Sequence, residues 1–384
     1  MAFDFNGEVY VSKIDEYDAE KIKSRLIDSF DELGINLSDY ASKNVVIKPN
    51  LVIRKAPDVA ATTHPAVLCA LIELLSENGI CPTIAESPGG IYSAARLGSI
   101  YKVCGVEDVA KKYGATLNFD VSSERMSFEG GHTLKNFNII TPIVKADVIF
   151  DVCKLKSHSL TTMSAASKNL FGTIPGVEKF EMHAAYPDIN DFTSMLCDLD
   201  AMLCEKKTII AITDGIVGME GEGPTGGTPK KIGALLVSKS IFASDAVAAR
   251  ILGLGDDDVL LLSEAKKRGY IGEFDHIHIS GDGIDGVKLT DFVLPESRIP
   301  PSLKLFSRGA IGKMFMPHPV ITKKCRACGE CVASCPQSTI RIVKGRAKIN
   351  RKNCIKCYCC QELCPFVAIK TYRNPIIKIV NKLK

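Results

Sequence analysis

Residues 325–336 read CRACGECVASCP, and residues 354–365 read CIKCYCCQELCP. Each stretch has three cysteines at two-residue gaps and a fourth cysteine, three residues further on, that precedes a proline. Bacterial two-cluster ferredoxins bind two 4Fe-4S clusters with this run, and the fourth cysteine of each run ligates the cluster of the other run. A zinc ribbon needs only two cysteine pairs and leaves the remaining cysteines unexplained. The two runs therefore predict a small α+β ferredoxin-like domain with two clusters.

The crossed pattern assigns four cysteine ligands to each predicted cluster. One cluster takes Cys325, Cys328, Cys331 and Cys364, and the other takes Cys335, Cys354, Cys357 and Cys360. The repeat thus accounts for eight of the nine cysteines between residues 325 and 364. Cys359 falls outside the repeat, next to Cys360, so we expect it not to be a ligand.

The first residues, MAFDFNGEVYVSKIDEYDAEK, include early acidic residues and lack the apolar core of a secretory signal. No stretch of the sequence has the roughly 18 consecutive apolar residues that favour a membrane-spanning helix. We therefore expect a cytoplasmic protein with no membrane partner. Cysteines stay reduced in that compartment, so we expect the cluster of cysteines to bind metal rather than form disulfides.

The net charge of +4 conceals two segments of opposite charge. Residues 321–384 contain 15 Lys and Arg residues and two Glu residues, a net charge of +13, so residues 1–320 carry −9. Two oxidised clusters with their thiolates lower the positive charge to about +9. Such a basic domain is expected to attract an acidic electron carrier, such as ferredoxin or flavodoxin, although the lysines could also serve only solubility. The near-neutral total gives no indication of a nucleic-acid partner.

Up to residue 295, short β-branched runs alternate with stretches of helical periodicity, which is typical of an α/β fold with a mostly parallel sheet flanked by helices. The predicted strands cover residues 9–14, 44–48, 83–86, 147–152, 208–213, 233–237 and 276–280. The predicted helices cover residues 19–33, 65–78, 94–113, 189–205, 244–252 and 259–268. We expect an α/β domain at 1–295, a proline-rich connector at 296–320, the ferredoxin domain at 321–372 and a basic tail at 373–384.

A block of polar and cationic residues follows the predicted strand at 147–152. Its candidate binding residues are Lys154, Lys156, His158, Lys168 and Asn169. The first three would lie in a loop before a helix that begins near Ser159 or Thr161. Ligands of α/β sheets bind at the carboxyl ends of strands, and the free amides of a helix start attract anions. The block predicts a site for a carboxylate or phosphate; the alternative is a basic loop that faces water.

Two other predicted strands also end in polar residues. NVVIKPN contains Lys48 and Asn50, and IAESPGG contains Glu86. Because the carboxyl ends of parallel strands meet at one edge of a sheet, we expect these residues to share a cleft with the cationic block. Glu86 and His158 are the candidate catalytic residues in this cleft.

The predicted strand at 208–213 leads into a glycine-rich acidic stretch, DGIVGMEGEGPTGGTPK. The stretch contains the glycine spacing of dinucleotide-binding loops, but Pro224 interrupts it and no helix is predicted to follow. We expect a mobile loop in which Asp214, Glu220 and Glu222 bind a divalent cation or transfer protons. A surface loop without such a role is the alternative.

Five motifs precede the cysteine runs in the order VVIKPN, AESPGG, KLKSHSLTTMSAASKNLFG, TDGIVGMEGEGP and ASDAVAA. With the two-cluster segment behind them, they resemble the family catalogued as domain of unknown function 362, uncharacterised iron-sulfur centre proteins of anaerobic bacteria and archaea. The resemblance covers residues 45–253 and the cysteine runs. It implies a cytosolic protein of an anaerobe with this domain order, and it implies no activity.

These features favour an iron-sulfur oxidoreductase. Electrons would pass from an external low-potential carrier through two 4Fe-4S clusters to a small anionic substrate in the cleft. Two alternatives stay open on the sequence: an electron-transfer or partner-docking protein without its own chemistry, and a non-redox enzyme whose clusters are structural.

Overall fold

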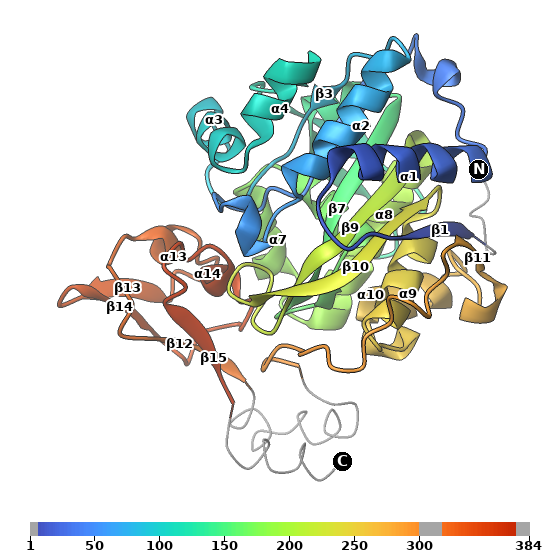
Figure 1. Ribbon diagram of the computed structural model, residues 1–384. Helices are drawn as coiled ribbons and strands as arrows, with labels where there is room; N and C mark the ends of the chain where they lie inside the picture. Colours follow the sequence, from blue (N-terminus) through green and yellow to red (C-terminus); the bar gives the residue numbers. More distant parts are fainter. Residues whose placement is uncertain (1–6, 299–316, 374–384) are drawn as a thin grey trace.

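A computed structural model describes residues 7–298 and 317–373. Figure 1 shows a large α/β domain and, beside it, a small domain formed by the cysteine-rich segment. Residues 299–316 of the expected connector and residues 374–384 of the expected basic tail lie outside the described residues. The domain boundaries at 295, 320 and 372 therefore stay predictions.

The large domain is built on a nine-stranded sheet. Its strands are β1 (Glu8–Lys13), β2 (Val45–Pro49), β3 (Thr83–Ile84), β4 (Thr116–Leu117), β7 (Val148–His158), β8 (Thr162–Ser164), β9 (Thr208–Glu220), β10 (Thr228–Ser238) and β11 (His278–Gly281). The order is β11-β1-β10-β9-β7-β2-β3-β4, with β8 paired to β7. Only β10 and β8 run antiparallel to their neighbours in this sheet. The predicted mostly parallel sheet is confirmed, and the carboxyl ends of β2, β3, β7 and β9 meet at one edge.

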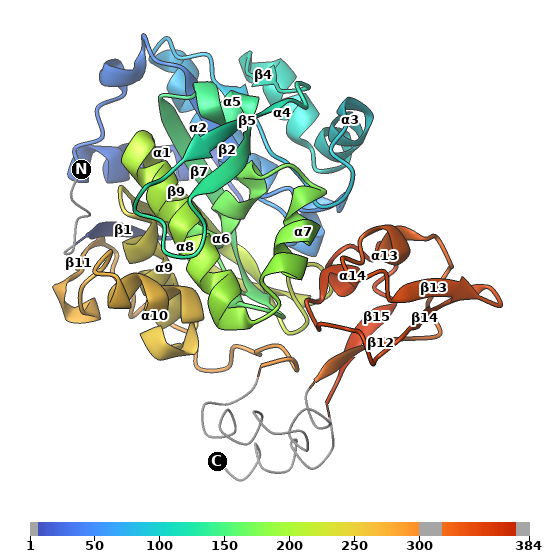
Figure 2. The same ribbon diagram turned by 180° about the vertical axis from the view of Figure 1, so that it is seen from behind.

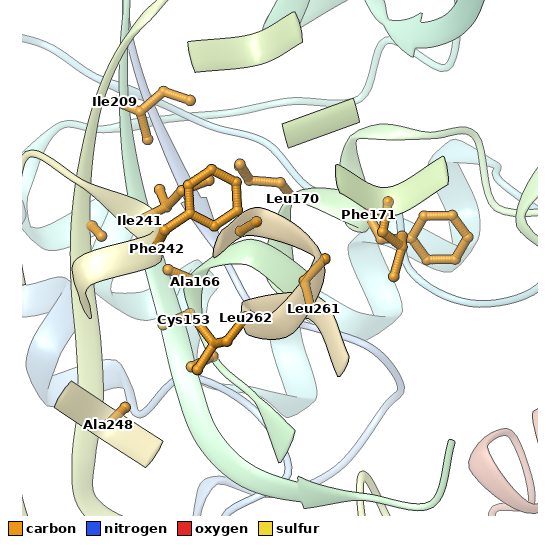
Figure 3. Packing of buried hydrophobic residues seen from close by; sticks show 14 of the residues in the cluster. Cys153, Ala166, Leu170, Phe171, Ile209, Ile241, Phe242, Ala248, Leu261 and Leu262 are labelled. Atoms are coloured by element: carbon orange, nitrogen blue, oxygen red, sulfur yellow. The ribbon is translucent and has the colours of Figure 1, made fainter. Parts of the chain in front are cut away.

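Helices cover both faces of the sheet (Figures 1 and 2). One core is completed by α1 (Ala19–Glu32), α2 (Pro65–Glu77), α3 (Ala94–Val103) and α4 (Val106–Tyr113). The other face carries α5 (Thr141–Lys145), α6 (Ala166–Leu170), α7 (Glu178–Ala185), α8 (Ile189–Lys206), α9 (Ile241–Ile251) and α10 (Leu260–Lys267). In this second core, Phe242 of α9 and Leu262 of α10 lie near Cys153 of β7 (Figure 3). No helix within the described ranges has the length and apolar character needed to cross a membrane.

The structure divides one predicted helix and contains one hairpin that was not predicted. The helix expected at 94–113 is divided into α3 and α4 by Gly105, whose φ of 73° lies in the left-handed region that favours glycine. The hairpin of β5 (Ser123–Ser127) and β6 (Asn136–Ile140) was not predicted. β5 is mostly exposed, so its sequence lacks the alternation that would have revealed it.

β7 and β9 extend well beyond the predicted strands. β7 continues through Lys154, Lys156 and His158, and all 11 of its residues are buried, so the cationic block is strand rather than loop. β9 reaches Glu220 and β10 begins at Thr228, which makes the acidic stretch a hairpin and not a mobile loop. Buried hydrogen-bond acceptors on neighbouring elements allow a charged strand to continue inside the sheet.

The small domain contains two antiparallel pairs of short strands and two short helices. β12 (His318–Ile321) pairs with β15 (Ile369–Tyr372), and β13 (Ile340–Val343) pairs with β14 (Arg346–Ile349), both antiparallel. The helices are α13 (Glu330–Ala333), which contains Cys331, and α14 (Cys359–Glu362), which contains Cys360. This is the small α+β domain that the cysteine runs predict.

The tip of the β9–β10 hairpin joins the two domains. Glu222 Oε2 accepts hydrogen bonds from Gln361 Nε2 at 3.0 Å and from the backbone N–H of Thr371 at 3.3 Å. Thr225 Oγ1 donates to the carbonyl oxygen of Glu362 at 2.6 Å. Helix α14 is thereby held against the carboxyl edge of the sheet.

A buried ion pair connects β7 to β9. Lys154 Nζ lies 2.9 Å from Asp214 Oδ2 and donates to the Tyr17 hydroxyl at 2.7 Å. Tyr17 in turn donates to Asp214 Oδ1 at 2.9 Å and stacks on the His64 ring. Both charged side chains are fully buried, so removing one partner would leave the other without compensation. Lys154 and Asp214 therefore stabilise the sheet.

Replacing Asp214 with alanine should lower the free energy of unfolding by about 3 to 5 kcal/mol, because the Lys154 ammonium would remain buried without a counter-charge. Asp15→Ala is the matched control, since its ion pair with Lys231 is exposed and should contribute little. Urea denaturation followed by circular dichroism measures both. Equal losses in the two variants would contradict this role for the buried pair.

Candidate functional site

The eight expected cluster ligands line two separate cavities in the small domain. One cavity is lined by Cys325, Cys328, Cys331 and Cys364, and the other by Cys335, Cys354, Cys357 and Cys360. Each cavity takes three cysteines from one run and the fourth from the other. This is the grouping that a pair of 4Fe-4S clusters requires.

Backbone amides also point at the ligand sulfurs. The N–H groups of Thr339, Ala347 and Ala368 donate to the sulfurs of Cys335 at 3.3 Å, Cys325 at 3.4 Å and Cys364 at 3.2 Å, respectively. Hydrogen bonds of this kind stabilise thiolates and tune the reduction potential of a bound cluster. The thiol donors and their amide partners therefore fit two 4Fe-4S clusters.

The divalent cation considered for the acidic stretch has no support in the described part of the chain. No group of three or more His, Cys, Asp or Glu side chains there could hold a metal ion. Cysteines that bind a cubane each ligate a different iron atom, so they do not form a single-ion site. Asp214 is paired with Lys154, and Glu220 accepts the backbone N–H of Val293 and lies 3.8 Å from Lys230.

A further cavity lies between the carboxyl edge of the large sheet and helix α14. Among the predicted site residues, it is lined by Asn50, Glu86, Lys156, His158, Lys168 and Asn169. The small domain contributes Cys359, Glu362 and Leu363 to the wall. About 60 Å³ of the cavity is open to water-sized groups, enough for about four to six such groups. This space accommodates a small anion.

Lys48 and Glu86 form an ion pair at the base of this cavity. Lys48 Nζ lies 2.6 Å from Glu86 Oε2, and both side chains are buried. Burial raises the pKa of Glu86, and the neighbouring Lys48 charge opposes that rise. A Cβ at Gly172 would lie 2.2 Å from Glu86 Oε1 and 2.8 Å from Lys48 Nζ, so the pair needs glycine at this position.

Lys156 and Lys179 reach the cavity with only neutral hydrogen-bond acceptors. Lys156 Nζ donates to Asn50 Oδ1 and to the carbonyl oxygen of Ala61, each at 2.6 Å. Lys179 Nζ donates to the carbonyl oxygens of Ser87 and Ile174. Burial lowers the pKa of each lysine to about 7, because no carboxylate lies close enough to offset the loss of hydration.

Lys168 is the third lysine of the cavity wall. Its ammonium lies 4.6 Å from the centre of the Phe171 ring and has no hydrogen bond or ion pair with any described residue. Burial lowers its pKa, while the charge of Glu362 opposes the effect. A ligand with a negative charge would supply the counter-charge that the three lysines lack.

His158 is a neutral hydrogen-bond donor rather than the cation that the sequence suggested. Its Nδ1 accepts the backbone N–H groups of Leu160 at 3.1 Å and Thr161 at 3.4 Å, which places the ring proton on Nε2. The side chain is 4% exposed, and burial together with the charges of Lys168 and Lys156 lowers its pKa well below the usual range. Nε2 has no hydrogen-bond partner in residues 7–298 and 317–373.

The expected anion site at a helix start is wrong. Helix α6 begins at Ala166, beyond Ser159 and Thr161, and Asp245 of α9 already accepts its first amides. The carboxylate oxygens lie 2.7 Å from the N–H of Ala166 and 3.2 Å from that of Ser167. The cationic groups at this edge of the sheet are instead side chains that line the cavity, those of Lys156, Lys168 and Lys179. Lys154, Asp214 and Glu220 do not line this cavity.

Sequence reasoning missed four titratable residues of the cavity wall: Lys179, His183, Cys359 and Glu362. Lys179 and His183 lie on α7, which the sequence did not predict. His183 stacks on Phe192, and burial lowers its pKa to about 3. Of these four, only Cys359 was noticeable in the sequence, because it is the one cysteine between residues 325 and 364 that the ligand repeat leaves without a role.

Relatives of known name resemble parts of this chain. Thylakoid-associated protein sll1697 of Synechocystis sp. is 30% identical over 233 residues, which cover 59% of this chain and 68% of that protein. DNA-directed RNA polymerase subunit Rpo3 of Methanosarcina mazei is 40% identical over 65 residues, 15% of this chain and 24% of the subunit. The second match spans only about a quarter of the relative, so it says little about the whole chain.

A solved structure, the lactate racemase apoprotein from Thermoanaerobacterium thermosaccharolyticum, is similar with a TM-score of 0.37 and 15% identity. The similarity covers 61% of this chain and 54% of that chain. A likeness at this level carries no argument about activity.

Two family descriptions match the sequence. Residues 319–365 match the 4Fe-4S dicluster domain, in agreement with the two cysteine-lined cavities. Residues 45–250 match the domain of unknown function DUF362 and contain every large-domain residue that the sequence predicted for the cleft. Because this second match covers more than half of the chain, the protein belongs to the DUF362 family and carries a C-terminal 4Fe-4S dicluster domain.

Proposed function

We propose that this chain is an iron-sulfur oxidoreductase that passes electrons from an external low-potential carrier to a small anionic substrate in the cavity between its domains. The supporting observation is the shared wall of that cavity. Cys359 and Leu363 line it, and they directly precede the cluster ligands Cys360 and Cys364. When bound, the two 4Fe-4S clusters supply electrons one at a time next to this wall.

The residues of the cavity divide into binding and proton-transfer roles. Lys156, Lys168 and Lys179 bind the anion, because buried ammonium groups without a carboxylate partner are stabilised by an added negative charge. The His158 Nε2–H donates a hydrogen bond to it. Glu86 is the acid that holds or releases a proton at the base of the cavity, since burial has raised its pKa.

An acidic carrier is expected to dock at the cluster bound by Cys325, Cys328, Cys331 and Cys364. Cys328 is exposed, and the exposed cations Lys323, Lys324 and Arg326 are its sequence neighbours. Phe366, 44% exposed, lines the same cluster cavity. A basic segment and an exposed apolar side chain at the same cluster cavity favour an acidic protein such as ferredoxin or flavodoxin.

Replacing Lys168 with methionine should weaken binding of acetate or phosphate at least tenfold, because the variant keeps the packing on Phe171 and removes one charge. Isothermal calorimetry on the anoxically prepared protein measures this affinity. Lys206→Met, on the exposed end of α8, is the matched control and should bind as the wild type does. Equal affinity in both variants would contradict the assignment of the cavity as the anion site.

Acetate affinity should fall as pH rises through about 7. Lys156 and Lys179 have pKa values of about 7 without a ligand, so their cationic forms are present below that pH and lost above it. Acetate stays ionised throughout, and uptake of one proton on binding gives about tenfold weaker binding per pH unit above 7. Calorimetry between pH 6 and pH 9 checks this, and a constant affinity over that range would count against the buried lysines as ligands.

Reduction of the protein by an acidic ferredoxin should slow as salt concentration rises, because salt screens the attraction to the basic surface. Stopped-flow absorbance measures the rate constants. The double variant Lys323→Glu/Lys324→Glu should be slower at low salt and less sensitive to added salt. Reduction by dithionite serves as the control, and its rate should be the same for the wild type and the double variant. A rate that is independent of salt would exclude this mode of docking.

A further inference from the structure

Asp151 is a fully buried carboxyl that lies behind the cavity and does not line it. It lies on β7 beside Lys48 of β2, its partner in the parallel register. Its Oδ1 accepts a hydrogen bond from Asn169 Nδ2 at 2.8 Å, whereas its Oδ2 has no partner among the described residues. A half-satisfied buried carboxyl is costly, so its presence needs a reason.

A continuous chain of hydrogen bonds connects this carboxyl to the cavity. Lys156 Nζ donates to Asn50 Oδ1 at 2.6 Å, and Asn50 Nδ2 donates to Asn169 Oδ1 at 2.7 Å. Asn169 Nδ2 completes the chain at Asp151 Oδ1. An ammonium can only donate, so each amide must turn its oxygen toward Lys156 and its nitrogen toward the carboxyl. A carboxyl oxygen at the far end supplies the acceptor that this direction requires, and the interaction is strongest when the carboxyl is ionised.

We infer that Asp151 is a positioning residue of the anion cavity, which acts through Asn169 and Asn50 to keep the Lys156 ammonium charged and in place beside the bound anion. The inference rests on the proposed function, since it presupposes that an anion binds there. It assigns a role to a residue that never touches the ligand. Aligned amide dipoles transmit part of the carboxylate charge to the ammonium, as in other polar networks of low dielectric constant.

The charges around Asp151 and Lys156, the two ends of the hydrogen-bond chain, agree with this coupling. Burial raises the pKa of Asp151 to about 8; Lys48 opposes the rise, while Asp245 and Glu86 add to it. Burial and the charges of Asp245 and Asp151 raise the pKa of Asp200 on α8. Burial and the charges of Lys154 and Lys168 lower the pKa of Lys156 to about 7, while the charges of Glu362 and Glu86 oppose this effect. Without an anion at pH 7, the Asp151 carboxyl is therefore mostly protonated and Lys156 is about half protonated, and an anion that favours the charged lysine also favours the charged carboxyl.

The test is calorimetry of acetate binding to the full, anoxically prepared protein between pH 6 and pH 9. Asp151→Asn should weaken acetate binding about fivefold at pH 8, as expected for coupling within one network. In this variant, acetate affinity should also begin to fall at a lower pH than in the wild type, because the Lys156 ammonium has lost a stabilising negative charge and its pKa is lower. Asp147→Asn is the matched control: Asp147 directly precedes β7, its carboxylate accepts the backbone N–H of Asn44 at 2.8 Å, and it does not line the cavity. This variant should keep the wild-type profile.

A second variant breaks the chain of hydrogen bonds in its middle. Asn169→Leu keeps the Asp151 carboxyl and removes the amide that connects it to Asn50, so it should also weaken acetate binding, and it tests the inference even where Asp151→Asn alone fails to fold. Adding Asp151→Asn to Asn169→Leu should cause no further change in the pH profile, because the connection is already broken. Cluster absorbance confirms that each variant is folded.

The outcomes separate this inference from the proposed function. A wild-type protein that binds neither acetate nor phosphate contradicts the proposed function and, with it, the role of Asp151. A wild-type protein that binds acetate, with an unchanged profile in Asp151→Asn, overturns the positioning role alone. An equal shift in Asp147→Asn, or a further shift when Asp151→Asn is added to Asn169→Leu, overturns it as well.

Discussion

Burial of lysine side chains at the carboxyl edge of a parallel sheet is the constraint on which the rest of this structure depends. An ammonium inside a protein needs a counter-charge or a full set of hydrogen-bond acceptors. Lys48 has Glu86 and Lys154 has Asp214, so those two charges are compensated within the large domain. Lys156 has only neutral oxygens, and the cavity forms where this compensation is incomplete.

The small domain completes the cavity. Its nearest negative charge, Glu362, offsets part of the burial cost of Lys156 and Lys168. The hairpin tip at Glu222 and Thr225 fixes α14 in that position. The same short helix therefore contributes a cluster ligand, Cys360, and a wall of the anion cavity. One short helix thus connects the proposed anion cavity with the cluster ligands.

The sequence predicted the sheet and the ligand set of the small domain because both have strong local patterns: alternating β-branched runs in one case and fixed cysteine spacing in the other. It predicted six of the cavity residues, four from polar positions after strands and two, Lys168 and Asn169, from the helix that follows. It could not predict that Lys154 and Asp214 pair with each other, because their partnership depends on a register between two strands. Lys179 and His183 were not predicted, because α7 is too short and its apolar pattern too irregular to be recognised from the sequence.

The claim that the cavity receives electrons from the clusters is tested most directly by their reduction potentials with and without a bound anion. The protein would be reconstituted anoxically to about eight irons per chain and titrated at pH 6 by electron paramagnetic resonance. At that pH, below the pKa of about 7 of Lys156 and Lys179, bound acetate adds a net negative charge beside the clusters. The account predicts that saturating acetate lowers the potential of at least one cluster. Potentials that stay unchanged while acetate is bound would contradict it.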